Sequence, residues 1–194
     1  KAFSCPFAFF CSYGLGIRNE LSADISEPIE TGNAVHHAMQ EAIGRFIEKN
    51  DGFDCFLSLS DDELSGLSRD ALSIAAEQYL HKSCADEKRV RGITGLLEPR
   101  LTSLLKQLKT DILCTGFVPV ATEKKLEYSS QCGIVFYGTA DRIDVKLRDS
   151  ERYIRICDYK TGNNEVSLEA LKHGLGLQMF IYMLTIFVQI FSKR

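Results

Sequence analysis

The chain has 194 residues, of which 45% are hydrophobic and 25% are charged, and its formal net charge is −3. This length is enough for one sizeable domain, and the composition is ordinary for a globular protein. The negative net charge argues against a wholly basic surface, although a local cationic groove would be compatible with it.

The cysteines and the most apolar stretch indicate the compartment. Seven cysteines are scattered along the chain without a CxxC pair, which is typical of a reduced, cytoplasmic protein rather than of a disulfide framework. Residues 177–191 are strongly apolar but contain Gln178 and Gln189, and they fall short of the roughly 20 residues of a membrane span. We therefore expect no membrane segment. Because the sequence lacks an initial Met and stops after an apolar helix, we also expect a fragment of a longer protein.

The first part of the chain, residues 1–112, is predicted to be mainly helical. Thr31-Gly32-Asn33 offers capping residues for one helix, and Ser60 with the acids after it starts another. A leucine stripe predicts a third long helix, with a kink or break at Pro99. The expected helices are a short one opened by Cys5-Pro6-Phe7 and longer ones over about 34–49, 60–80 and 86–110.

The second part, residues 113–194, has a different sequence pattern, which is typical of strands. Three strand-like runs, "GFVPVATEKKLEYS", "GIVFYGTADRIDVKL" and "RYIRICDYK", are separated by short polar turns. A last amphipathic helix is expected over about 167–191. Helices, then a three-stranded meander, then a helix predict an α/β or α+β sandwich on a central sheet, which we expect to form a single domain over residues 1–194.

Charged residues lie at unusual places on two neighbouring predicted strands. On the second strand, Asp141 shares a face with apolar residues, whereas Arg142 and Asp144 lie on the other face. On the third strand, Asp158 and Lys160 share a face where the strand ends. Each has an ordinary explanation, either a satisfied buried hydrogen bond or an ion pair at a strand tip. An unpaired carboxylate on an inward face would be costly, however.

Taken together, these residues favour metal-dependent hydrolysis. Asp141 and Asp158, at the ends of neighbouring strands, can share one divalent cation, because Mg²⁺ and Mn²⁺ prefer oxygen ligands. Lys160 would face the same space, where it could orient a water or stabilise charge developing on a phosphate. A set of two carboxylates and a lysine suits the hydrolysis of phosphodiester bonds.

The motifs "GTADRID", "DYKTG" and "QMFIY", in this order, resemble those of the PD-(D/E)XK nucleases of the RecB type. The resemblance implies a restriction-endonuclease-like core, with a central mixed sheet and a β-meander flanked by helices. It implies that Asp141, Asp158 and the backbone carbonyl of Tyr159 bind Mg²⁺ or Mn²⁺, and that Lys160 is catalytic. The helix motif implies assisting roles near DNA for two further residues, Gln178 and Tyr182.

The same resemblance points to two residues outside these motifs. A histidine on an early helix of the family matches His36, which follows Gly32 at the expected spacing, and Glu123 matches a further acid that precedes the first aspartate motif. The helical pattern predicts that His36 faces the metal site, with an imidazole that burial keeps neutral, while His37 faces solvent. The alternative is that His36 is a core histidine bonded to a backbone carbonyl.

The opening "CPFAFF" is most similar to the C-terminal nuclease domains of AddB-type helicase–nuclease subunits. In those domains a first cysteine, matched by Cys5, joins three later ones in a 4Fe–4S cluster, which we expect here only in the full-length protein. The resemblance implies a cytoplasmic, metal-dependent DNA exonuclease that processes double-strand breaks for repair and recombination with an AddA-like helicase partner. Two alternatives stay open: a Cas4-like or stand-alone RecB-like exonuclease, and a DNA-binding scaffold without turnover.

Overall fold

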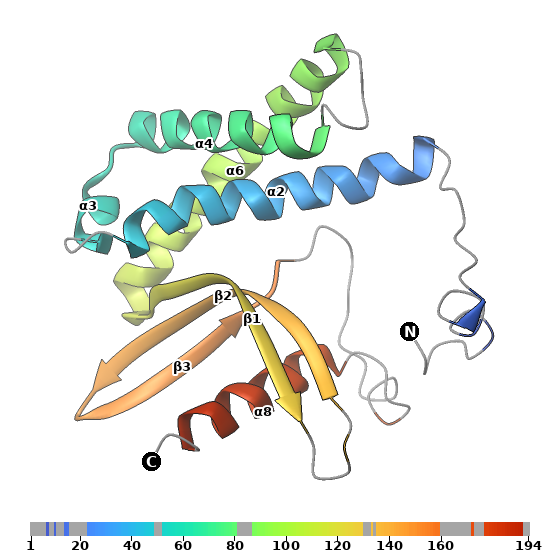
Figure 1. The fold of residues 1–194 in the computed structure, drawn as a ribbon. Coiled ribbons are helices and arrows are strands. Elements are labelled where there is room, and N and C mark those ends of the chain that lie inside the picture. The colour runs from blue at the N-terminus through green and yellow to red at the C-terminus, as the bar shows by residue number, and fades with distance from the viewer. Residues whose placement is uncertain are drawn as a thin grey trace. The chain divides into compact units, whose positions relative to one another are not determined.

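The computed structural model describes residues 7, 10, 14–15, 23–48, 52–80, 87–129, 133, 135–159, 172 and 177–191. The elements, in chain order, are α2 (Ala23–Ile47), α3 (Gly52–Ser58), α4 (Asp61–Ala75), the π-helical η2 (Ala76–Leu80), α6 (Glu87–Thr115), β1 (Val118–Ser129), β2 (Val135–Arg148), β3 (Glu151–Cys157) and α8 (Gln178–Phe191) (Figure 1). The predicted helix at Cys5, the catalytic candidate Lys160 and the first part of the last predicted helix lie outside the described residues.

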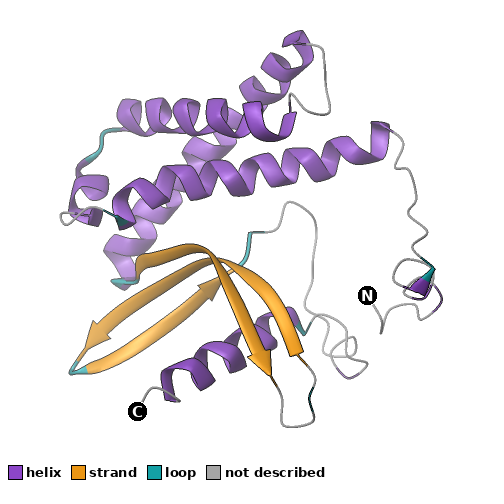
Figure 2. Cartoon of the chain, viewed as in Figure 1, coloured by secondary structure: helices purple, strands orange, loops and turns teal. Residues whose placement is uncertain are grey.

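The chain divides into two compact units. The larger unit comprises residues 23–125 and 139–159, and the smaller one comprises residues 1–22, 126–138 and 160–194. Helices lead the larger unit and strands follow, which is the mixed α/β order that the sequence predicts (Figure 2).

Local signals explain where α4 begins. The Ser60 hydroxyl accepts a hydrogen bond from the Glu63 N–H (3.3 Å), and the Glu63 carboxylate accepts one from the Ser60 N–H (2.7 Å). This reciprocal capping box satisfies backbone donors that the first turn of a helix leaves open. The helix predicted from Ser60 to about Leu80 is confirmed, its last five residues being η2.

The other two predicted helices are longer than expected. The helix predicted over about 34–49 begins at Ala23, so Thr31-Gly32-Asn33 lies inside α2 and does not cap it. The helix predicted over about 86–110 continues through Pro99 to Thr115, so no break occurs there. Proline removes one backbone hydrogen bond, but Leu97 and Leu101 on either side of it are buried in the same core. Tertiary packing of this kind overrides local breaking signals.

Helices α2, α4 and α6 enclose one apolar core in the larger unit. Helix α2 supplies alanines and larger residues at helical spacing, α6 supplies a leucine stripe, and α3 adds aromatic rings. Its fully buried large members include Met39, Ile43, Phe56, Leu64, Leu72, Leu101 and Leu105. This core fixes the face that α2 can turn towards the strands.

The predicted three-stranded meander is confirmed, with strand order β1-β2-β3. Strands β2 and β3 are antiparallel, with Asp144 opposite Arg155 and Arg148 opposite Glu151. Asp149 and Ser150 join them, and both have positive φ angles (51° and 67°). Two such residues form the type of two-residue turn whose twist matches that of the flanking strands.

In the smaller unit, α8 packs closely on the start of β2. A Cβ atom added to Gly138 would lie 2.2 Å from Cε1 of Tyr182, so this position of the "GTADRID" motif requires glycine. Tyr182 is buried, and its hydroxyl accepts a hydrogen bond from Nε2 of Gln178 (2.9 Å). Gln178 itself is exposed, so it does not interrupt a buried stripe of α8, as its spacing from the apolar residues of the predicted helix would suggest. Within the described residues, no helix has the length and apolar character of a bilayer-spanning segment.

Candidate active site

Three potential metal ligands converge in the larger unit. His36 of α2, Glu123 of β1 and Asp141 of β2 each offer one ligand atom, and these atoms all lie within 4.8 Å of one another. Nδ1 of His36 is 3.4 Å from Oδ2 of Asp141. Asp141, which the strand pattern singles out, is thus brought together with the histidine and the acid that were matched through the family resemblance.

The backbone of Glu123 has an unusual conformation. Its φ angle is +46°, in the left-handed region that side chains other than glycine rarely adopt. The next two residues, Lys124 and Lys125, are both exposed, which a regularly alternating strand would not give. An irregularity of this kind within a strand changes the direction in which a side chain points, and such irregularities are often found beside active sites. Here it belongs to the residue whose carboxylate joins the cluster.

The ionisable groups of the cluster affect one another's pKa values. The hydrogen bond with Asp141 raises the pKa of His36 against the opposing effect of burial, and the Tyr159 backbone adds to the rise. Burial, followed by the charge of Asp141, raises the pKa of Glu123. Burial thus acts in the predicted direction, but the hydrogen bond with Asp141 outweighs it, and the pKa of His36 lies above rather than below its usual value.

A divalent cation would fit this set of donors. One imidazole nitrogen and two carboxylates are suitable ligands for Mn²⁺ or Mg²⁺. A cation between the two carboxylates would also offset the repulsion that raises the pKa of Glu123. Binding requires neutral imidazole and ionised carboxylates, so it would be accompanied by proton release.

The end of β3 also reaches the cluster. The backbone N–H of Tyr159 donates a short hydrogen bond to Oδ2 of Asp141. The rings of Tyr159 and His36 form a T-shaped pair, with 5.8 Å between the ring centroids and an interplanar angle of 85°. Asp158, directly after β3, is half-buried. Among the described residues, the close group of three ligands does not include Asp158, whose role therefore stays a prediction.

Two of the remaining predicted site residues are described, and both belong to the smaller unit. Gln178 and Tyr182 bond to each other in the smaller unit, and their role near DNA stays a prediction. The same holds for Lys160 and Cys5, which lie outside the described residues.

His37 does not face solvent as predicted. Its side chain is 14% exposed, less than the 28% of His36, and its Nε2 lies 3.8 Å from Glu41. Helix α2 contacts α3, α4, η2 and α6, so little of its surface is left open to water. The half of the prediction that turns His36 towards Asp141 is confirmed.

Sequence reasoning missed a partly buried charge cluster on the other face of β2. Asp144 is fully buried and accepts hydrogen bonds from Arg142 (2.8 Å to Nε) and Arg155 (2.7 Å to Nη2). Arg155 also donates to Asp111 of α6. We name these four residues the charge cluster. The hairpin register, which places Asp144 opposite Arg155, was the signal that could have predicted it.

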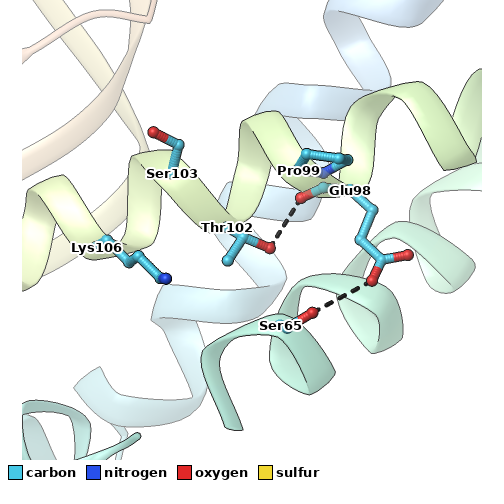
Figure 3. A pocket seen from close by; sticks show the side chains of 6 residues that line it. All are labelled: Ser65, Glu98, Pro99, Thr102, Ser103 and Lys106. Carbon is cyan, nitrogen blue, oxygen red and sulfur yellow. Dashed lines mark hydrogen bonds between the residues drawn. The ribbon is translucent and has the colours of Figure 1, made fainter. Parts of the chain in front are cut away.

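A hollow of about 400 Å³ between α4 and α6 is a weaker candidate (Figure 3). Ser65 donates to the Glu98 carboxylate (3.3 Å), and the Thr102 hydroxyl donates to the Glu98 backbone carbonyl (2.8 Å). The first of these bonds joins α4 to α6, and the second lies within α6. The described residues that line the hollow include no residue of the His36 cluster.

The cluster of potential metal ligands, supplied by a helix and two strands of the meander, indicates the class of protein to which this chain belongs. The chain belongs to the PD-(D/E)XK nuclease superfamily, whose sequence pattern it matches over residues 2–189.

Among curated proteins, the chain is similar to ATP-dependent helicase/deoxyribonuclease subunits of the AddB type. That of Listeria welshimeri is 25% identical over 94% of this chain, and that of Thermoanaerobacter sp. (strain X514) is 29% identical over 94%. That of Caldanaerobacter subterraneus subsp. tengcongensis is 27% identical over 100%. The chain spans only 16–17% of the length of these relatives. The resemblance inferred from the motifs is confirmed.

Proposed function

We propose that this chain is a divalent-metal-dependent deoxyribonuclease domain that hydrolyses phosphodiester bonds of DNA. The observation that carries the proposal is the convergence of His36, Glu123 and Asp141 within 4.8 Å in a chain of a nuclease superfamily. Three donors of this kind, contributed by a helix and two strands, suit Mg²⁺ or Mn²⁺ better than any purely structural role.

Each residue has a definite part in the proposed site. His36, Glu123 and Asp141 would hold the metal, joined by Asp158 and the carbonyl of Tyr159. When bound, the metal would act as a Lewis acid towards the phosphate and lower the pKa of an attacking water. Lys160 would orient that water or stabilise the charge that develops on the phosphate.

Residues of the smaller unit would act on the DNA. The Gln178–Tyr182 hydrogen bond would hold both side chains in place for contact with the strand that is cleaved.

The wider proposal concerns the whole protein. The names of the curated relatives support a deoxyribonuclease domain within a helicase–nuclease subunit. We propose further that this domain is an exonuclease, which would process double-strand DNA ends with an AddA-like helicase partner in the cytoplasm. In the full-length protein, Cys5 would be the first ligand of a 4Fe–4S cluster. A Cas4-like or stand-alone RecB-like exonuclease would instead be encoded as a short polypeptide, and a scaffold would bind DNA without cleaving it.

The test is cleavage of end-labelled double-stranded DNA by the 194-residue chain with Mg²⁺, Mn²⁺ or EDTA. We expect EDTA to abolish cleavage and Asp141→Asn to lower the rate by at least about 100-fold, since the variant loses a ligand charge. Asp149→Asn, at the exposed β2–β3 turn, is the matched control and should cleave normally. Cleavage that survives both EDTA and Asp141→Asn would contradict the proposal.

A further inference from the structure

Tyr159 connects the metal-ligand cluster with the charge cluster on the other face of the strands. Its N–H donates to Asp141, and its ring forms a T-shaped pair with the ring of His36. At the far end of the side chain, the hydroxyl accepts a hydrogen bond from Nη1 of Arg142 (2.8 Å). Burial raises the pKa of Tyr159 to about 12, so this hydroxyl stays protonated at neutral pH.

Arg142 is itself rigidly held. It is 8% exposed, and Nε and Nη2 donate to the two carboxylate oxygens of Asp144 at 2.8 and 3.1 Å. This bidentate geometry fixes the plane of the guanidinium and therefore the direction of Nη1. The guanidinium carbon also lies 5.6 Å from the centre of the Tyr159 ring.

The charge cluster extends this support to α6. Arg155 donates both to Asp144 and to Asp111 of α6, so two arginines face two aspartates. Buried ion pairs such as those that Asp144 makes contribute little net stability when compared with apolar packing, because desolvation offsets their attraction. Their defined directions make them better suited to fixing geometry, and the side chain that they fix here is Tyr159.

We infer that Arg142 and Tyr159 are positioning residues, through which the charge cluster holds His36 and Asp141 in the geometry that binds a divalent metal. This inference rests on the proposed function. Partners that orient metal ligands typically change metal affinity by about 10–100-fold when they are lost.

The test measures Mn²⁺ binding to the 194-residue chain by isothermal titration calorimetry, without DNA. Tyr159→Phe removes the hydroxyl that Arg142 holds but keeps the ring and the backbone N–H. We expect its Kd for Mn²⁺ to rise by about tenfold. Tyr153→Phe is the matched control, because it removes a hydroxyl on exposed Tyr153 of β3 whose hydrogen bond, within the described residues, is a local one to Glu151, and its Kd should stay unchanged.

A second pair of variants tests whether Arg142 acts through Tyr159. Arg142→Lys keeps the charge and loses the bidentate geometry, so we expect weaker Mn²⁺ binding. Adding Tyr159→Phe to Arg142→Lys should then weaken binding little further, since both changes break the same connection. Thermal melting without metal confirms that the variants are folded; if Arg142→Lys unfolds, Tyr159→Phe alone decides.

The outcomes separate this inference from the proposed function. If the wild-type chain binds Mn²⁺, Asp141→Asn abolishes binding and Tyr159→Phe matches Tyr153→Phe, the positioning role is wrong and the metal site stands. If the wild-type chain binds no Mn²⁺, or if Asp141→Asn binds it normally, both the positioning role and the proposed function are wrong. Independent, additive losses in the double variant would overturn the role of Arg142.

Discussion

Glu123 illustrates at the scale of a single residue how a functional group can be held at a cost in stability. Its positive φ angle places a non-glycine side chain in a conformation that costs about 1–2 kcal/mol. The pKa of its carboxyl is raised by burial and then by Asp141, so its charge is also disfavoured. Neither feature serves the fold, and both are explained if the carboxylate is needed to bind a cation.

We therefore predict that Glu123→Gly and Glu123→Gln both weaken Mn²⁺ binding but differ in stability. Both remove the carboxylate, but only glycine relieves the strain. After its greater unfolded-state entropy is allowed for, the glycine variant should be more stable than the glutamine variant by about 0.5–1 kcal/mol. Urea unfolding of the two variants measures the difference. A less stable glycine variant would show that the backbone at this position is not strained.

At the scale of elements, the ion pair between Asp111 and Arg155 joins α6 to β3. The hydrogen bond with Arg155 is the main cause that holds the pKa of Asp111 below its usual value. A carboxyl with a depressed folded-state pKa adds stability above its unfolded pKa of about 3.9, and this stability is lost as pH falls through the folded pKa. Because the side chain is 33% exposed, solvent screening limits the effect.

Asp111→Asn should accordingly lower the free energy of unfolding at pH 7 by about 1–2 kcal/mol, allowing for that exposure. The difference from wild type should shrink as the pH falls below the unfolded pKa of about 3.9, and it should vanish once the pH passes the lower folded pKa, where protonated Asp111 no longer differs in charge from asparagine. Denaturant titrations across this range measure it. A difference that is constant with pH would show that the loss comes from packing rather than from the ion pair.

The same scale separates what could be predicted from sequence from what could not. The start of α4 and the three strands depend on local signals, a capping box and alternating apolar residues with polar turns, and these were predicted. The start of α2, the burial of Arg142 and Asp144, and the low exposure of His37 depend on which elements pack together. No local pattern in the sequence shows which elements pack together.

The candidate site was predictable to the extent that it follows motif order and helix phase. His36 approaches Asp141 because the apolar face of α2 fixes its rotation, which the sequence pattern already indicates. The contribution of Glu123 depends on a strained backbone, and that of Tyr159 depends on bonds at both of its ends. Such features arise from three-dimensional packing, so sequence could point to these two residues only through the family resemblance.

At the scale of the whole molecule, the proposed chemistry involves both compact units. His36, Glu123, Asp141 and Tyr159 belong to the larger unit, whereas Lys160 and the Gln178–Tyr182 pair belong to the smaller one. The larger unit therefore contains the proposed ligands, and their metal affinity can be measured separately from cleavage.

The most direct test of the central claim is the location of Mn²⁺ by anomalous X-ray diffraction from crystals of the chain grown with saturating MnCl₂. The account predicts an anomalous peak bound by His36, Glu123 and Asp141, at roughly 2.1–2.3 Å from their ligand atoms. Crystals of Asp141→Asn grown in the same way should lose the peak. A wild-type crystal without Mn²⁺ at these three residues would contradict the claim that they form the metal site of a nuclease.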